Sequence, residues 1–486
     1  MGILSLIIWL PLVGAVVILF LSQQQIRLIQ SVALVCAGAS LALSWNLLTS
    51  FDATIPALQF VEKLQWVPEM GMTYNIGVDG LSLPMVLLTT LLSLVSLIAS
   101  VSSITERTKA YFAWFLLLEF AILGVFVAQD WFLFYMFWEI TLIPMFFLIG
   151  IWGGKERTTA SMSFFLYTLG GSVFMLLGII AAYLATPAHT FDMIEIAKAN
   201  VGWSKEFQIM VFMAFFIGLA VKVPVFPLHG WLPLAHVEAP VPVSMMLSGV
   251  LLKMGAYGLL RISGLVPEGL LWFLPFLMVL GLVNIIYGAL MAWRQTDLKS
   301  MVAFSSVSHM GFVLIGIAGL TLAGFTGAVM QMFTHGIITA ALFLLIGVIY
   351  ERTHTRQITD FGGLSRTVPV FSVAMSLSML ASMGLPGLAG FISEFHALVG
   401  AWERWGLYVT FASIGILVTA AYSLRTIGKM FMGPFNPRWE GLQDLTPREY
   451  VATAPLILLM VGLGLFPSFA LNLMNATLKQ MVVIFK

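Results

Sequence analysis

Apolar runs recur along the whole chain, and several exceed the roughly 20 residues that a helix needs to cross a bilayer. Charged residues make up only 9% of the chain, whereas an ordinary soluble domain has about 25%. So few charges cannot cover a soluble surface. The sequence therefore predicts an all-α polytopic membrane protein.

The hydropathy pattern predicts about 14 transmembrane spans, joined mostly by short polar segments. They are expected at residues 3–22, 29–48, 81–103, 110–128, 132–152, 160–185, 207–227, 241–262, 270–292, 299–318, 323–349, 369–397, 406–428 and 452–475. The longest gaps, 49–80, 186–206 and 429–451, are predicted to be loops. The first apolar run lacks a basic leader and a convincing cleavage site, so we expect it to be a span.

Lys and Arg predict the orientation of these spans. Loops on the side of the first connection carry about twice as many of these residues as loops on the other side. Cytoplasmic loops are the ones enriched in Lys and Arg. We therefore expect both termini on the outer side of the membrane.

One predicted span is interrupted by the stretch GLAVKVPVFPLHGWLP at residues 218–233. It places Lys222 next to Pro224, Pro227 and Pro233, in an otherwise apolar segment. Proline removes a backbone donor and clashes with the preceding turn. Irregular backbone at membrane depth is tolerated only where protein buries it or where it lines a wet cavity. The stretch therefore predicts a broken helix in the protein interior, with its lysine accessible to water.

A second interruption, SMGLPGLAGFISEF at residues 382–395, has Pro386 among glycines and then Glu394. Broken helices in corresponding positions of two halves are typical of inverted repeats with an ion site near the midplane. We expect two inverted five-helix repeats, spans 4–8 and 9–13, with broken helices 7 and 12. The predicted divisions are 1–105 (three N-terminal spans), 106–263 (first repeat), 264–430 (second repeat) and 431–486 (C-terminal span and tail).

Ionisable side chains within spans are the candidates for function, because each costs about 2.5–3.5 kcal/mol at mid-span on insertion scales. They are Glu119, Glu139, Lys222, Lys253, His309, His335 and Glu394, with His396 near a span end. Structural interpretations also exist: ion pairs for Glu139 and Lys222, a tolerated interior carboxyl for Glu119, and hydrogen-bonded core positions for the histidines. Acids, amines and imidazoles spread over several spans nevertheless favour a proton path, because such groups exchange protons through water.

Other chemistries find little support. The sequence has no GxxxxGK phosphate loop, no GxGxxG after a strand and no HExxH. Cys36 is the only cysteine, and an iron–sulfur cluster needs about four ligands. The net charge of +1 gives no reason to expect nucleic-acid binding.

Several motifs together resemble a known family. They are DWFLFYMFWEITLIPMFFLIGIWGG (130–154), RTTASMSFFLYTLGGS (157–172), KVPVFPLHGWLPLAHVEAP (222–240), LLKMGAYGLLR (251–261), QTDLKSMVAFSSVSHMGFVLIG (295–316) and LPGLAGFISEF (385–395). In order and spacing they resemble the antiporter-like subunit M family of bacterial respiratory complex I, the NADH:quinone oxidoreductase. The mitochondrial counterpart is NADH dehydrogenase subunit four.

The resemblance implies roles for six residues. Glu139 looks like the glutamate that pairs with the broken-helix lysine, here Lys222. Lys253 looks like the second lysine, on the link to the other half-channel. His309 and His335 match histidines of the central hydrophilic axis, and Glu394 matches the terminal acid near the exit.

Two positions depart from the family pattern. Leu234 stands where an acid is usual, and Ser163 stands where lysine is common. These departures put the proton entry route and lateral contacts in question. Glu119 has no counterpart that we carry over.

The function implied is proton translocation in the membrane arm of a redox-driven complex in the bacterial inner membrane. No cofactor is expected in this chain; FMN, iron–sulfur clusters and quinone are expected in partner subunits, with neighbouring antiporter-like subunits and lipid as contacts. The alternatives are a subunit of a cation/proton (Mrp-type) antiporter or of a membrane-bound hydrogenase, and a passive scaffold. Interior charges weigh against the scaffold.

Overall fold

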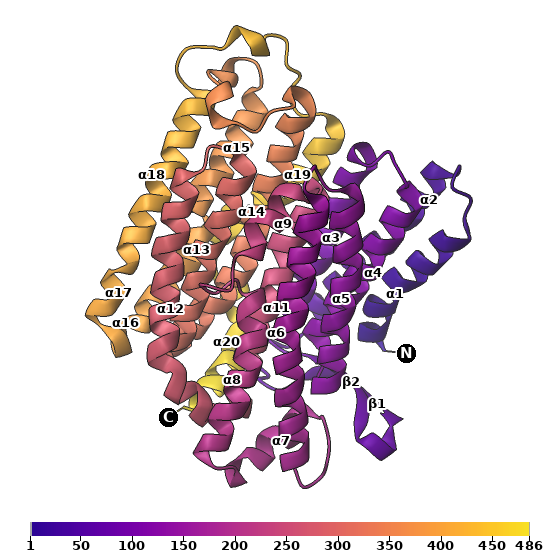
Figure 1. Cartoon of the computed structure of the whole chain (residues 1–486), viewed down its shortest axis with the longest axis vertical. Coiled ribbons are helices and arrows are strands. Elements are labelled where there is room, and N and C mark those ends of the chain that lie inside the picture. Colours follow the sequence, from indigo (N-terminus) through magenta and orange to yellow (C-terminus); the bar gives the residue numbers. More distant parts are fainter. Residues whose placement is uncertain (1, 486) are drawn as a thin grey trace.

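The computed structural model describes residues 2–485, which form a bundle of long helices lying roughly side by side (Figure 1). Within this range, 12 helices are long and apolar enough to cross a membrane. They are α1 (Ile3–Phe20), α2 (Ile26–Ser50), α3 (Ser82–Ser103), α4 (Thr108–Val127), α5 (Trp131–Trp152), α6 (Arg157–Ala185), the α10–α11 unit (Val241–Leu265), α12 (Pro267–Arg294), α13 (Leu298–Gly319), α14 (Leu322–Thr353), the α17–α18 unit (Leu407–Phe431) and α19 (Pro447–Leu465). The chain is thus a multi-pass, mostly helical membrane protein.

Two of these units are not uniform helices. The first consists of α10 (Val241–Met246), a π-helical turn (Leu247–Leu251) and α11 (Leu252–Leu265). The second consists of α17 (Leu407–Thr410) and α18 (Ala412–Phe431). A π-helical turn inserts one residue into the helical repeat and is frequent at functional sites.

Both interruptions expected from proline occur where the sequence places them. Helix α8 (Lys205–Lys222) ends at the lysine, and α9 (Trp231–Glu238) begins after an irregular link. Similarly, α15 (Pro369–Ser382) and α16 (Ala389–Trp405) are separated by a segment containing Pro386. Helices α9, α15 and α16 are too short to count among the 12 spans. Helix α8 is not counted because it contains three charged residues.

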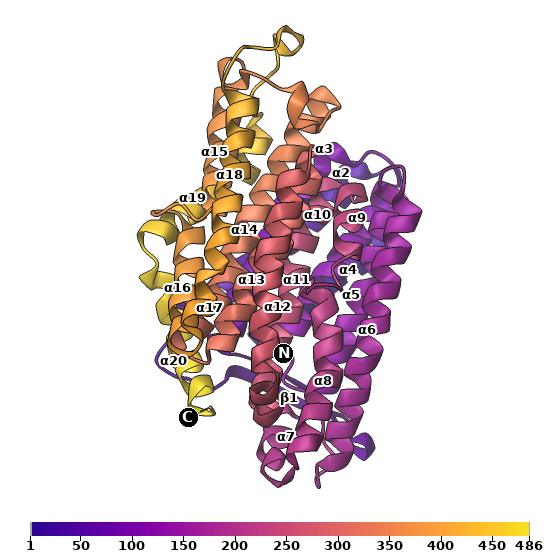
Figure 2. The same cartoon turned by 60° about the vertical axis from the view of Figure 1, so that its left-hand side comes forward.

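Helices α13 and α14 lie at the centre of the bundle. Together with the α10–α11 unit they are buried along nearly their whole length. Helices α12 and α16 pack directly against α13, and α16 also packs against α14. Helices α1 and α2 form one edge, and α18 lies at the opposite edge, as Figures 1 and 2 show from two directions. The central helices are therefore screened from lipid by their neighbours.

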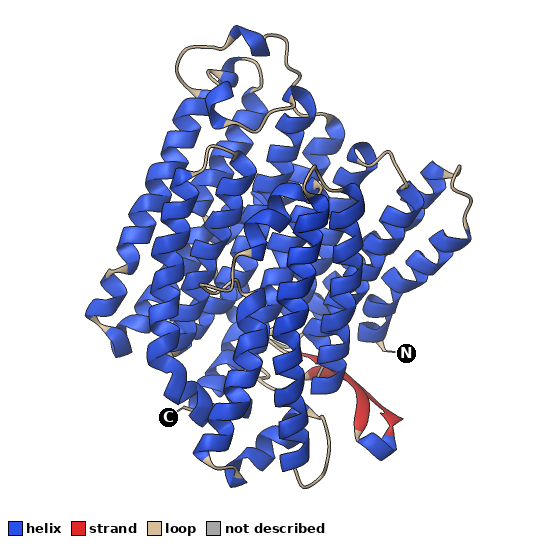
Figure 3. Ribbon diagram, in the orientation of Figure 1, coloured by secondary structure: helices blue, strands red, loops and turns tan. Residues whose placement is uncertain are grey.

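Three predictions about connections were wrong. Residues 49–80 do not form a loop but contain an antiparallel hairpin of β1 (Gln59–Val67) and β2 (Met72–Val78), drawn red in Figure 3. Residues 186–206 include the short helix α7 (Met193–Ala199). The predicted span 452–475 is divided at Pro467 between α19 and α20 (Ser468–Val483), because proline cannot continue the hydrogen-bonding of the preceding turn.

The hairpin ties distant segments together at one end of the bundle. The ammonium of Lys63 lies 2.7 Å from the Asp192 carboxylate at the start of α7. Glu62 accepts hydrogen bonds from the backbone N–H groups of Gly2 and Ser5 at the start of α1. Both carboxylates thus sit at helix N-termini, where unsatisfied N–H groups attract negative charge.

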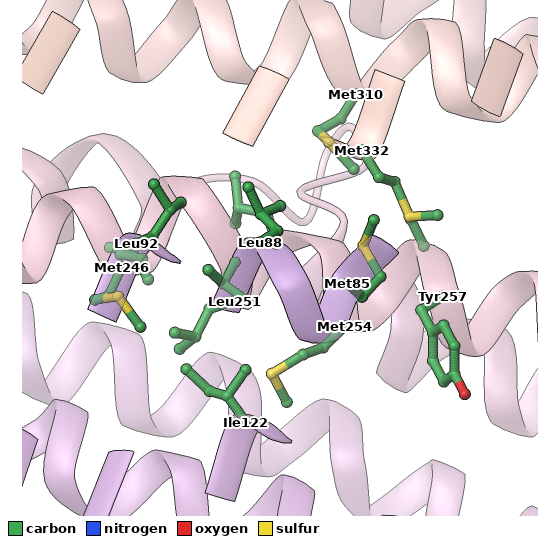
Figure 4. Packing of buried hydrophobic residues seen from close by; sticks show 14 of the residues in the cluster. Met85, Leu88, Leu92, Ile122, Met246, Leu251, Met254, Tyr257, Met310 and Met332 are labelled. Atoms are coloured by element: carbon green, nitrogen blue, oxygen red, sulfur yellow. The ribbon is translucent and has the colours of Figure 1, made fainter. Parts of the chain in front are cut away.

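The hydrophobic core joins the N-terminal helices to the central ones. Figure 4 shows Met85, Leu88 and Leu92 of α3 lying between the α10–α11 unit and the central helices, with Met310 and Met332 nearby. All five side chains are completely buried. Methionine is unbranched and flexible, so its side chain can fill the irregular gaps between these helices.

Candidate functional site

Hydrogen bonds from side chains hold the first break together. Asn284 of α12 accepts a hydrogen bond from the backbone N–H of Phe226 at 2.8 Å and donates to the carbonyl of Pro224 at 3.1 Å. The indole of Trp231 donates to the carbonyl of Val221 at 3.0 Å. Backbone groups freed by a break at membrane depth must find such partners. The interruption is therefore a built feature of the interior.

Lys222 lies at the end of α8, completely buried. In the described part of the chain, residues 2–485, its ammonium has no hydrogen-bond partner. It faces two aromatic rings, at 5.4 Å from the centroid of Trp138 and 5.1 Å from that of Phe164. Both distances are within the range of about 6 Å for cation–π attraction.

Glu139 lies on α5, directly after Trp138, and is partly buried. Its charge acts on Lys222. Among residues 2–485, however, no ion pair within 4.0 Å joins the two, and Oε1 of Glu139 has no hydrogen-bond partner. The resemblance implies an ion pair between Glu139 and Lys222, but the described part of this structure has no direct ion pair between the two side chains. The ammonium of Lys222 contacts the aromatic rings of Trp138 and Phe164 instead.

The other four predicted residues form one connected group in the centre of the bundle. The ammonium of Lys253 on α11 lies 2.7 Å from Nδ1 of His335 on α14, and it also donates to the carbonyl of Ser248. The rings of His335 and His309 lie with centroids 5.5 Å apart. Nδ1 of His309, on α13, lies 3.0 Å from Oε1 of Glu394. Four ionisable groups, each on a different helix, therefore lie next to one another in space in the order Lys253, His335, His309 and Glu394.

This group ends at the second break. Ser382, the last residue of α15, has its hydroxyl 3.0 Å from Nε2 of His309. Gly384 and Gly387 in the link have φ of 76° and 92°, a left-handed conformation that favours glycine. A side chain at Gly384 would also lie only 2.8 Å from Oε2 of Glu394. The glycines thus let the chain turn sharply beside the carboxylate.

A polar cavity of about 570 Å³ opens where α5, α9, α10, α13 and α14 approach their ends. Its charged lining residues are Lys155, Glu238, Lys299, Glu351 and Arg356. Lys299 is buried, and its ammonium donates to the carbonyls of Val237 and Ala239 at the end of α9. Cations near a helix C-terminus are favoured by the exposed carbonyls there.

Next to this region lies His236, on α9. Its ring is fully buried, stacks on Phe343 at 4.7 Å, and has no hydrogen-bond partner on either nitrogen within residues 2–485. The charges of Lys299 and Lys253 both act on it. His236 directly precedes Val237, which lines the cavity.

At the other end of the bundle, a buried ion pair joins the segment before α3 to α11. The Arg261 guanidinium contacts both carboxylate oxygens of Asp79, at 2.7 and 2.8 Å. Burial raises the pKa of the Asp79 carboxyl, but the charge and hydrogen bonds of Arg261 outweigh it and leave the pKa below its ordinary value. Arg261 lies on the same helix as Lys253, about two turns further along α11, so this pair stands apart from the central group.

Glu119 does not join the central group. Its carboxylate on α4 is fully buried, and neither oxygen has a hydrogen-bond partner among the described residues 2–485. Its charge acts on Cys36 of α2, which places it toward the N-terminal helices. His396 is half-buried and bonded to the carbonyl of Ile392 in its own helix.

Sequence reasoning missed four contributors: Trp138, Phe164, Asn284 and Ser382. Aromatic residues are abundant in this chain, so no pattern singled out these two rings. Asn284 did carry a signal, because an amide in the run FLMVLGLVNIIYGAL is costly in lipid unless it has partners.

Comparisons with known proteins agree with this architecture. The family model described as NADH:quinone oxidoreductase/Mrp antiporter, TM, matches residues 128–419. The chain is 39% identical to NADH-quinone oxidoreductase subunit M of Rickettsia conorii, with 99% of both chains covered. It is 40% identical to NADH-ubiquinone oxidoreductase chain 4 of Arabidopsis thaliana, covering 99% of this chain and 97% of the relative.

Solved structures give the same picture. A chain of respiratory complex I from Thermus thermophilus, with bound NADH, is similar over 99% of both chains, with 29% identity and a TM-score of 0.89. A chain of the Mrp complex from Dietzia sp. DQ12-45-1b shares the fold, with 23% identity over 99% of this chain and 98% of that one and a TM-score of 0.86. The chain belongs to the family of NADH:quinone oxidoreductase and Mrp antiporter transmembrane subunits.

Proposed function

We propose that protons cross this chain along Glu139, Lys222, Lys253, His335, His309 and Glu394. The observation that carries the proposal is the connected group of Lys253, the two histidines and Glu394, buried on four different helices between two broken ones. Ionisable groups in a membrane interior are expensive, so their alignment favours a transport function over a structural one.

The chain is a proton-translocating membrane-arm subunit of a NADH:quinone oxidoreductase. Its relatives over the full length are subunits of that complex. Its partners are other membrane-arm subunits, including antiporter-like ones. In our proposal the redox cofactors, FMN, iron–sulfur clusters and quinone, belong to partner subunits, and this chain contributes only the proton path.

The proposed topology treats each interrupted pair, α8–α9 and α15–α16, as one broken span, which gives 14 spans in total. Residues 106–263 and 264–430 then form two inverted five-helix repeats, flanked by 1–105 and 431–486. Both ends of the chain lie toward the same end of the bundle in Figures 1 and 2, as an even number of spans requires. We assign that end to the periplasmic side of a bacterial inner membrane, because Lys and Arg are more frequent at the other end.

The proposed mechanism uses the two lysines as proton carriers. The cavity beside Lys299 supplies protons from the cytoplasmic side, and His236, next in the chain to the cavity-lining Val237, relays them toward Lys253. Pairing with the Glu139 carboxylate favours the protonated form of Lys222, and loss of that pairing favours release of the proton toward Lys253. Lys253 passes its proton to His335, and His309 passes one to Glu394 beside the second break.

Exchanging Glu139 for glutamine tests the proposal. Glutamine has nearly the same size but no charge, so the complex should assemble and reduce quinone poorly, with vesicle acidification lost. Glu119→Gln is the control, since it makes the same substitution at a fully buried carboxyl that lies away from the path. Normal acidification by Glu139→Gln, measured in vesicles with assembly checked on native gels, would refute the role of Glu139. If purified complexes lacked NADH oxidation altogether, the antiporter alternative would gain instead.

A further inference from the structure

We propose that Trp138 and Phe164 form an aromatic pocket that holds the ammonium of Lys222 apart from Glu139 and sets how tightly the unpaired lysine keeps its proton. The inference rests on the proposed proton path and adds two positioning residues to it. We call the two rings the aromatic pocket.

The geometry of the pocket supports this role. The ammonium lies 5.4 Å from the Trp138 centroid and 5.1 Å from the Phe164 centroid, and it has no other polar partner in residues 2–485. Trp138 is 1% exposed, and Phe164 and Lys222 are completely buried. An aromatic face attracts a cation through its quadrupole, and the attraction strengthens when water is excluded. The rings are therefore direct contacts that stabilise the charged form of the lysine in this position.

The break in the helix helps to build the pocket. Trp231, the first residue of α9, packs edge-on against Phe164 with centroids 5.4 Å apart. The same indole donates to the carbonyl of Val221, the residue before Lys222. The Trp231 side chain thus contacts both the end of α8 and the Phe164 ring of the pocket. The pocket and the break therefore depend on the same residue.

Lys222 has two different kinds of neighbour on α5, a ring and a carboxylate. Trp138 and Glu139 are consecutive on α5, so their side chains leave the helix about 100° apart and approach the lysine from neighbouring sides. The flexible four-carbon stem of lysine allows its ammonium to move between such neighbours. A carboxylate both attracts the ammonium and can accept its proton, whereas a ring only attracts it. The pocket therefore holds a charged lysine without offering an acceptor.

Several ionisable groups lie on the elements around Lys222. They are Tyr135 and Glu139 on α5, Arg157, Tyr167 and Tyr183 on α6, His229 in the link, His236 and Glu238 on α9, Lys253, Tyr257 and Arg261 on α11, and Glu268, Tyr287 and Arg294 on α12. Glu139 is the group whose charge acts on Lys222. Changing the rings while Glu139 is kept therefore tests how much the rings alone stabilise the charged form of Lys222.

The test uses fluorinated tryptophans placed at position 138 of the assembled complex, with one, two or three fluorines on the indole. Each fluorine weakens the attraction of the ring for a cation but leaves its shape nearly unchanged. Vesicle acidification is measured from pH 6 to 10. We expect the alkaline limb to move to lower pH step by step, by about one unit in total, equivalent to about 1.4 kcal/mol.

Controls separate this effect from loss of packing. The same fluorinated residues at Trp131, equally buried on α5, should leave the limb in place. Phe164→Leu should move it in the same direction as fluorination of Trp138. A uniform loss of rate at all pH values, with no movement of the limb, would overturn the pocket and leave only a packing role.

Lys222→Ala distinguishes failure of the pocket from failure of the proton path. If this variant acidifies vesicles normally, the proposed path and the pocket are both refuted. If it is inactive while the fluorinated series shows no trend, the pocket alone is refuted.

Discussion

Replacing Lys222 by arginine asks whether this residue must release its proton or only carry a charge. Arginine keeps the positive charge, and its planar guanidinium stacks well on aromatic faces. The two rings beside Lys222, at 5.1 and 5.4 Å from its ammonium, can therefore hold either cation. We expect Lys222→Arg to assemble like the wild type, whereas Lys222→Ala leaves the pocket empty.

The size of the expected defect follows from the proton affinities. At pH 7.5, the neutral fraction is about 10⁻³ for a lysine at its reference pKa of about 10.4 and about 10⁻⁵ for an arginine at about 12.5. A turnover that passes through the neutral side chain is thus slowed about 100-fold, or about 2.8 kcal/mol. Moving a proton against roughly 150–200 mV already requires about 3.5–4.6 kcal/mol. The substitution raises the free energy of the step by more than half.

The assay compares quinone reduction and vesicle acidification in the wild type, Lys222→Ala and Lys222→Arg at matched expression. Both variants should assemble on native gels and lose acidification. They should also lose most electron transfer, because a stalled proton step holds back the coupled redox step. Full activity in the arginine variant would refute the claim that Lys222 titrates during turnover, and it would favour a structural ion pair.

Three further predictions concern other parts of the molecule. Glu394→Gln should reduce vesicle acidification at least about tenfold, because it removes the acid bonded to His309. His396→Ala should change it little, and equal effects would contradict an exit near the second break. Asn284→Leu should lower the thermal stability of the purified complex by about 1–3 kcal/mol per orphaned backbone group, and an unchanged melting temperature would show that the break needs no such support. Arg261→Leu should lower the free energy of unfolding by about 3–5 kcal/mol, because it leaves the buried Asp79 carboxylate without its cation. Lys198→Ala, which removes an exposed ion pair, should leave the melting temperature nearly unchanged in the same assay, and similar losses of stability in the two variants would refute this ranking.

The membrane class, the long helices and both broken helices follow from local properties of the sequence. Hydrophobic length decides whether a segment can span a bilayer, and clustered prolines, or a proline flanked by glycines, disfavour a continuous helix. Lys222 and Glu394 were recognisable for the same reason, since a charge inside an apolar run must face the protein interior. The residues between Asp52 and Val78 lack such a run, and their pairing into a hairpin depends on contacts with α1 and α7 that no local pattern reveals.

The contacts within the proton path belong to the tertiary structure. Lys253 and His335 are 82 residues apart in the chain, and His309 and Glu394 are 85 residues apart, so only the packing of α11, α13, α14 and α16 brings them together. A shift of one residue turns a helical side chain by about 100°, which is enough to exchange a ring for a carboxylate as the nearest neighbour. For this reason the sequence identified Lys222 as a functional residue, but the helix packing placed it against Trp138 and Phe164 rather than in an ion pair with Glu139.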